Sequence, residues 1–239
     1  MDPFSFAPIA FLLSAAYNGV EAIATLFEPL TGAASAALAI VALTLIVRSA
    51  LIPVGISQVK AEWARRRLAP KLKALQLKYK KNPEQLQKKT MDLYKSENVS
   101  PFAGMLPLLA QAPILSIIYA LFIRASVDGH ANALLTQPLL GVPLGTSFTH
   151  LLASGAAWPG VLVFVGLFLI VAAVAWLSRR SALKNSLEEP TGLVKLLSWM
   201  PFITVIFAAV VPLAATLYLA TTTVWTFVER ALLRRRLWV

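Results

Sequence analysis

Long apolar runs alternate with short basic blocks along the chain, and this alternation predicts its architecture. No charged residue occurs within 98–123, 129–178 or 196–228, and Arg48 is the only charge between Glu28 and Lys60. The hydrocarbon core of a bilayer is about 30 Å thick and needs around 20 helical residues to cross. Each run is therefore long enough to span it. The pattern predicts an all-α polytopic membrane protein rather than a soluble domain.

The last uncharged run is too long for a single crossing. As one helix, residues 196–228 would rise about 50 Å, which exceeds the bilayer thickness even with tilt. Both flanks of the run are basic, so both ends belong on the same side of the membrane. Pro212 lies in the middle, where it can break a helix. We therefore expect two short spans that turn on the outer side.

The basic residues orient these spans. Twenty of the 22 lysines and arginines fall in three short blocks, which the positive-inside rule places in the cytoplasm. The predicted order is an extracytoplasmic segment at 1–33, spans at 34–57, 103–123, 158–178, 196–211 and 213–229, cytoplasmic segments at 58–99, 179–195 and 230–239, and an extracytoplasmic loop at 124–157. We therefore expect five spans, with the N-terminus outside the cell and the C-terminus in the cytoplasm.

The N-terminal segment 1–33 carries an amphipathic pattern. Val20, Ile23 and Phe27 recur at helical spacing, opposite Glu21 and Glu28. This spacing is typical of a helix lying in the outer membrane interface. An ordinary extracellular loop is the alternative.

The cytoplasmic block 58–99 reads as a helical hairpin. Leu68, Leu72 and Leu75 share one helical face, and Asn82 followed by Pro83 is a typical start for a second helix. The many lysines and arginines form either a solvated face or a docking surface for anionic lipid, ribosomal RNA or an acidic partner. The two interpretations are compatible.

Composition limits the chemistry that the chain can perform. Cysteine is absent, 58% of residues are hydrophobic, and His130 and His150 lie far apart without acidic neighbours. We therefore expect no metal site, no cofactor and no enzymatic activity. No phosphate-binding GxxxxGK[ST] loop is present, and the uncharged runs offer no carboxylate for coupled transport. A small passive channel or a transporter subunit remains the alternative function.

The order of motifs resembles one known family. The run "VRSALIPVGISQVKAEWARRRLAPKLKALQLKYKKNPEQLQKKTMDLYKSENVSPFAGMLPLLAQAPILSIIYALF" begins at Val47, and "WMPFITVIF" and "VPLAATLY" follow near the C-terminus. Together they resemble the conserved domain of the YidC/Oxa/Albino membrane protein insertases, in a compact bacterial form of Gram-positive type. The resemblance implies nascent membrane protein clients, and as partners the ribosome, the signal recognition particle receptor and the Sec translocon.

Arg48 is the residue on which the functional interpretation depends. Snorkelling of its long side chain toward the headgroups is one explanation for a cation in an apolar span. The resemblance implies another, a hydrophilic groove between the spans that is open to the cytoplasm and contains this arginine. Polar residues of several spans could line it, although such residues also join helices by hydrogen bonds. The expected client-binding residues are Arg48, Thr44, Gln111, Tyr218 and Thr222.

Overall fold

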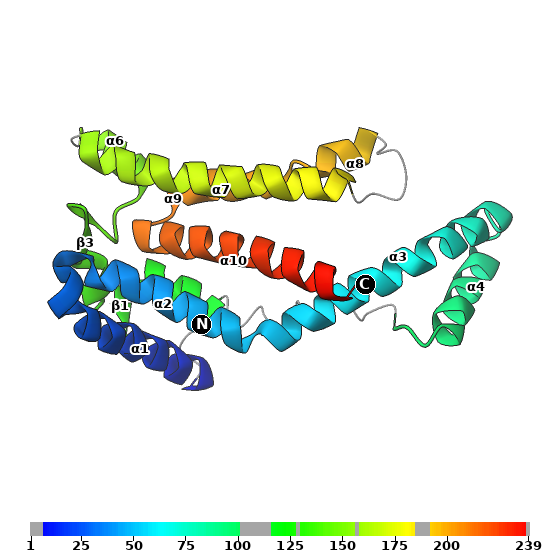
Figure 1. Cartoon of the computed structure of the whole chain (residues 1–239), viewed down its shortest axis with the longest axis horizontal. Coiled ribbons are helices and arrows are strands. Elements are labelled where there is room, and N and C mark those ends of the chain that lie inside the picture. Colours follow the sequence, from blue (N-terminus) through cyan, green and yellow to red (C-terminus); the bar gives the residue numbers. More distant parts are fainter. Residues whose placement is uncertain (1–6, 101–115, 128–129, 156–157, 185–191, 238–239) are drawn as a thin grey trace. The chain divides into compact units, whose positions relative to one another are not determined.

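The computed structural model describes residues 7–100, 116–127, 130–155, 158–184 and 192–237. Within these ranges the chain is mainly helical, and its only strands are two residues long (Figure 1). This composition agrees with the predicted all-α class. The chain divides into two compact units. The first unit comprises Met1–Ala50 and Ile114–Val228, and the second comprises Leu51–Pro113 and Glu229–Val239.

The first unit begins with two helices that pack on each other, α1 (Ala7–Thr31) and α2 (Ser35–Ala50). A single 3-10 turn, η2 (Gly32–Ala34), joins them, and Gly32 adopts the positive φ that lets the chain reverse (Figure 1). Val20 of α1 is fully buried in the same core as Ile40 of α2. Glu21 and Glu28 are exposed. The N-terminal segment is thus helical, and its side that carries Val20 packs against α2, whereas Leu26 and Leu30 are exposed.

A second group of helices follows α7 (Trp158–Lys184). It consists of α8 (Gly192–Leu197), η4 (Met200–Phe202) and α9 (Ile203–Val210), and both η4 and α9 pack against α7. The guanidinium of Arg179 lies 4.3 Å from the ring centroid of Trp199, and its Nε donates to the Ser198 hydroxyl at 3.1 Å. This cation–π contact joins the end of α7 to the segment that precedes α9.

The predicted helix break at Pro212 is confirmed. Helix α9 ends at Val210, Val211 is extended, and α10 (Leu213–Leu237) begins directly after the proline. The first backbone N–H groups of a helix have no partner within it. Those of Leu213 and Ala214 donate to the carbonyls of Thr146 and Leu144, both at 2.9 Å. The segment before α6 therefore caps the start of α10.

The segment expected as an extracytoplasmic loop carries regular structure. Strands β1 (Ser126–Val127) and β2 (His130–Ala131) pair, as do β3 (Pro138–Leu139) and β4 (Val142–Pro143), followed by α6 (Phe148–Ala153). The 3-10 turn η3 (Ala133–Thr136) separates the two pairs. Leu140 and Gly141 both have positive φ, as a tight primed turn requires. These short pairs satisfy backbone groups that a structureless loop would leave to solvent.

Two stretches are long and apolar enough to cross a membrane by length and composition. They lie within Pro8–Ala50 and within Trp158–Lys184, and Lys195–Val210 is a shorter apolar helix. In α7, the flanking Trp158 and Trp176 are both exposed, at 80% and 49%. Most of the second predicted span, 103–123, lies outside the described residues; its part from 116 to 123 is helical.

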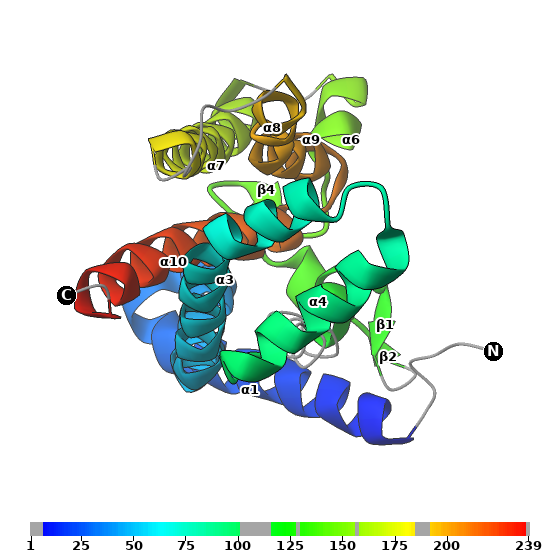
Figure 2. The same ribbon diagram turned by 90° about the vertical axis from the view of Figure 1, so that its right-hand side faces the viewer.

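The second unit contains α3 (Ile52–Lys78), α4 (Pro83–Ser96) and the last turns of α10. Helix α4 folds back along α3 (Figure 2). The side chain of Asn82 accepts a hydrogen bond from the backbone N–H of Gln85 at 3.1 Å, so the predicted N-cap is confirmed. Leu68 is fully buried and Leu72 and Leu75 are half-buried, as expected for one apolar face.

Candidate functional site

Arg48 lies near the C-terminal end of α2 and contacts α10. Its Nε donates a hydrogen bond to the hydroxyl of Thr222 at 3.1 Å, and both residues are half-buried. Across the described part of the chain, Thr222 is the only hydrogen-bond partner of Arg48, and no carboxylate pairs with it. Among the described residues, the charge of this guanidinium is therefore not neutralised by an acidic side chain.

Thr222 differs from the threonines on either side of it. The hydroxyl of Thr221 donates to the Leu217 carbonyl, and that of Thr223 to the carbonyls of Leu219 and Ala220, so both are satisfied within α10. This back-bonding is the usual way for a hydroxyl to be satisfied in an apolar helix. Thr222 instead accepts a hydrogen bond from another helix. Of these three adjacent threonines, it is the one that the arginine orients.

Thr44 and Tyr218 lie one turn away from this pair, on α2 and α10 respectively. Thr44 is 3% exposed, and its hydroxyl donates to the carbonyl of Ile40 at 2.7 Å. Tyr218 is 4% exposed, and its ring centroid lies 6.1 Å from that of Phe122. Both residues are thus buried within the protein. The hydroxyl of Thr44 is already bonded to its own helix.

The structure brings Arg48 and Thr222 into direct contact and places Thr44 and Tyr218 on the same two helices. Gln111, the fifth expected residue, lies outside the described residues. Phe122 is a neighbour of the site that the sequence did not single out, because nothing in its local pattern indicates that it faces Tyr218. Among the described residues, no group of three or more histidines, cysteines or carboxylates could hold a metal ion.

A second polar cluster closes the basic hairpin. Glu97 follows the last turn of α4, and its carboxylate binds Lys71 and also Arg67, the latter at 3.0 Å, both on α3. The hydrogen bond from Lys71 lowers the pKa of the Glu97 carboxyl below the ordinary 4.5, and the positive charges of Lys71 and Arg67 add to this effect. One carboxylate thus joins the end of α4 to two cations of α3.

The sequence of the whole domain matches one family. The family model described as 60Kd inner membrane protein covers residues 26–238. The membrane protein insertase YidC of Clostridium perfringens is 36% identical over 115 residues, which are 48% of this chain and 48% of that protein. The inner membrane ALBINO3-like protein 2 of Chlamydomonas reinhardtii chloroplasts is 30% identical over 194 residues, 75% of this chain and 45% of that protein.

A further relative extends over more of its own length. The membrane protein insertase YidC of Oceanobacillus iheyensis is 27% identical over 202 residues, 83% of this chain and 74% of that protein. The chain spans about half the length of the Clostridium and Chlamydomonas relatives. The family match and these relatives agree with the motifs that run from Val47 to the last helix. The chain therefore belongs to the 60Kd inner membrane protein family, the YidC/Oxa/Albino family that its sequence resembles.

Proposed function

We propose that the chain is a membrane protein insertase. It passes hydrophilic segments of client proteins through a hydrated groove within the membrane and releases their transmembrane helices into lipid. Family membership supports the class of activity. The single observation that supports the mechanism is the Arg48–Thr222 contact, because it holds a cation on an apolar helix with no carboxylate beside it in the described chain.

The unpaired charge has a physical consequence. Removing a cation from water costs several kcal/mol unless an opposite charge or water compensates it. Among the described residues, Arg48 donates to one neutral hydroxyl, that of Thr222, so in this proposal water or an acidic residue of a client compensates the rest of its charge. A client carboxylate near the guanidinium gains Coulomb energy that grows as the local dielectric constant falls. Thr44, Gln111, Tyr218 and Thr222 line the path beside Arg48 in this proposal.

Release requires no nucleotide. Once its polar segment has moved past Arg48, the apolar helix of the client is driven into lipid by burial of its own surface, at about 25 cal/mol per Å². The insertase lowers the barrier for the polar segment, and the hydrophobic effect supplies the direction. The protein itself undergoes no covalent change in this scheme, which makes it a chaperone of insertion rather than an enzyme.

The proposed topology is five spans in a bacterial plasma membrane, with the N-terminus outside and the C-terminus in the cytoplasm. Two long apolar stretches, a shorter one at Lys195–Val210 and the helix break at Pro212 support it. The basic hairpin then faces anionic lipid on the cytoplasmic side, where it can meet the ribosome, the signal recognition particle receptor or the Sec translocon.

Insertion of a single-spanning client with an acidic translocated tail tests the role of Arg48. In proteoliposomes, we expect Arg48→Ala to abolish most insertion of this client and Arg48→Lys to retain part of it, since lysine keeps the charge. A matched client with a neutral tail is the control and should depend less on Arg48. Equal loss in both variants would argue against a charge role, and full insertion by both would remove Arg48 from the mechanism.

A further inference from the structure

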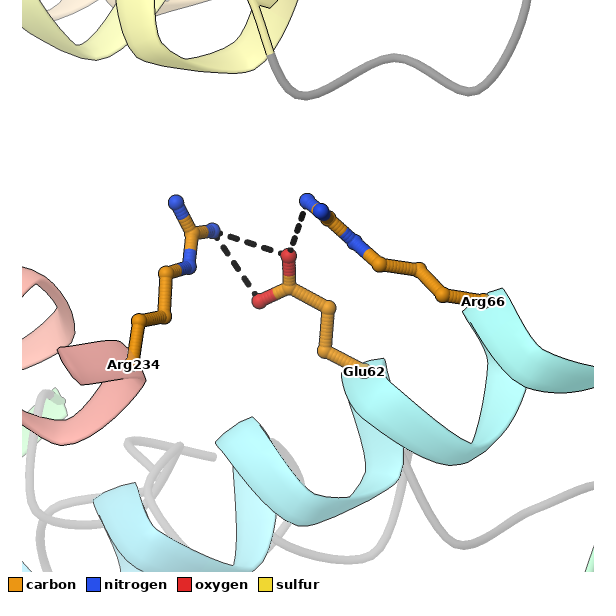
Figure 3. Close-up of polar contacts among 3 residues, drawn as sticks. All are labelled: Glu62, Arg66 and Arg234. Atoms are coloured by element: carbon orange, nitrogen blue, oxygen red, sulfur yellow. Dashed lines mark hydrogen bonds and ion pairs between the residues drawn. The ribbon is translucent and has the colours of Figure 1, made fainter. Parts of the chain in front are cut away.

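The second unit contains a three-residue ionic bridge that the sequence pattern did not reveal. Glu62 of α3 binds Arg234 of α10: Nη2 of Arg234 lies 2.8 Å from Oε1 and 3.0 Å from Oε2 of the carboxylate (Figure 3). Nη2 of Arg66, one turn along α3, lies 2.8 Å from the same Oε1. We call these residues the Glu62 bridge.

This bridge is partly shielded from water. The side chains of Glu62, Arg66 and Arg234 are 31%, 25% and 20% exposed. Fully exposed ion pairs contribute little, because water screens them and the two side chains lose conformational freedom. Partial burial strengthens the attraction, and one carboxylate binds both guanidiniums at once. Loss of Glu62 would leave Arg66 and Arg234 close together as like charges.

A second contact brings the same two helices together. Gly55 of α3 lies against Glu229 of α10, and the carboxylate of Glu229 occupies the space that a β-carbon at position 55 would take. Gly55 and Glu62 are seven residues apart, about two helical turns, and so lie on one side of α3. Glu229 and Arg234 occupy the last turns of α10. Helices α3 and α10 are therefore in contact at two places, Gly55–Glu229 and Glu62–Arg234.

The bridge also divides the basic C-terminal block. Arg234 is turned toward Glu62, whereas Arg235 and Arg236 are exposed. Within this block of four basic residues, at 230 and 234–236, one arginine thus has a structural role. Helix α10, which ends with this basic block, also carries Thr222.

We propose that Glu62 is a positioning residue of the insertase. By binding Arg234 and Arg66 together, its carboxylate joins the base of the basic hairpin to the end of α10, so that these two elements keep a fixed distance while a client is inserted. Glu62 does not contact the client in this scheme and acts through Arg234. The role in insertion rests on the proposed function, whereas the bridge itself can be measured independently.

Charge exchange across the bridge provides the test. We expect Glu62→Arg and Arg234→Glu each to reduce insertion about fivefold, and the Glu62→Arg/Arg234→Glu double variant to recover most of it, as coupled residues do. Glu84→Arg and Arg235→Glu are matched controls, because both residues are exposed and have no ion pair in the described chain. Each control changes the net charge by the same amount as the corresponding test variant, and both controls should support normal insertion of the client.

A distance measurement separates the bridge from the activity. The chain has no cysteine, so spin labels can be attached at Lys60→Cys and Leu232→Cys, two exposed positions on α3 and α10. Glu62→Arg and Arg234→Glu should each broaden the distribution of distances between the two labels. The Glu62→Arg/Arg234→Glu variant should narrow this distribution again. The thermal midpoint of each variant identifies those that fail to fold.

The outcomes are distinct. Unchanged distances in the single variants, or no recovery in the double variant, would overturn the bridge. If the distances change in the single variants and are restored in the double variant while insertion stays constant, the bridge is a structural contact only. This result would overturn the positioning role of Glu62. Absence of insertion by the unmodified protein would count against the proposed function, and the distances would still decide whether Glu62 joins the two helices.

Discussion

At the residue scale, the site depends on which hydroxyl meets a guanidinium. Three consecutive threonines occupy α10, and only the middle one accepts a hydrogen bond from Arg48. The hydroxyls of the other two donate to carbonyls of their own helix, so these polar groups are satisfied without a partner on another helix. Identical side chains thus have different roles because successive helical residues point about 100° apart. The sequence pattern alone, three threonines in a row, does not distinguish the residue that contacts Arg48 from its neighbours.

Removing the Thr222 hydroxyl should expose this difference. We expect Thr222→Val to destabilise the protein by about 0.5–1.5 kcal/mol, because a charged donor loses its partner, and to reduce insertion of clients with acidic tails. Thr223→Val makes the same change of side chain at the next position. It should have a smaller effect on stability and on insertion, since the Thr223 hydroxyl bonds only its own helix. Thermal unfolding in detergent and insertion in proteoliposomes check the pair. Equal effects of the two variants would contradict the role given to Thr222.

At the element scale, carboxylates join one helix to another, both between consecutive helices and between helices far apart in sequence. Glu97 joins the end of α4 to α3 through Lys71 and Arg67. Glu62 joins α3 to the end of α10 through Arg234. A hairpin that carries many positive charges repels itself, so acidic residues at its base have a large effect on its geometry. Helix α3 is therefore joined to the end of α4 by Glu97 and to the end of α10 by Glu62.

Acidification should loosen the hairpin. The pKa of Glu97 is lowered below 4.5 in the folded protein, so its contribution is complete at neutral pH and is lost as the pH falls through the folded-state pKa, below 4.5. Spin labels at the exposed positions Gln76→Cys and Gln87→Cys should report a broader α3–α4 distance at acidic pH. The Glu97→Gln variant should already be broad at neutral pH and respond little to acid. A distance that is independent of pH in the unmodified protein would contradict this assignment.

At the scale of the whole molecule, topology follows from how apolar length and positive charge are distributed. Two apolar stretches are long enough to cross a membrane, and a third is shorter. The break at Pro212 and the basic flanks of the last uncharged run support the two crossings proposed there. The five crossings that we propose are compatible with these features.

Single cysteines can test this topology directly, because the chain has none. A membrane-impermeant thiol reagent should label Leu140→Cys from the outside and Leu77→Cys only after the membrane is opened. Both positions are exposed, at 75% and 69%, so accessibility within the protein is not limiting. Ala39→Cys, at a fully buried position, should remain unlabelled in either case. Labelling of both exposed positions from the same side would exclude the proposed arrangement.

The local features of this protein follow from its sequence. The N-cap at Asn82, the break at Pro212 and the apolar face of the N-terminal helix were all predictable, because each depends on residues within a few positions of one another. The family was recognisable for a similar reason, since its motifs occur in order along one stretch of chain. The short strand pairs between 124 and 157 were not predicted, because two-residue strands have no measurable alternation.

Contacts between distant segments were decided by the tertiary structure. Arg48 and Thr222 are 174 positions apart, and Glu62 and Arg234 are 172 apart. The sequence predicted that Arg48 would lie near polar residues of other spans, and several were candidates. It did not show which hydroxyl would lie within hydrogen-bonding distance of the guanidinium. It also gave no sign that one of three adjacent arginines would turn toward α3. Helical periodicity determines which face a residue occupies, whereas packing between helices determines what that face meets.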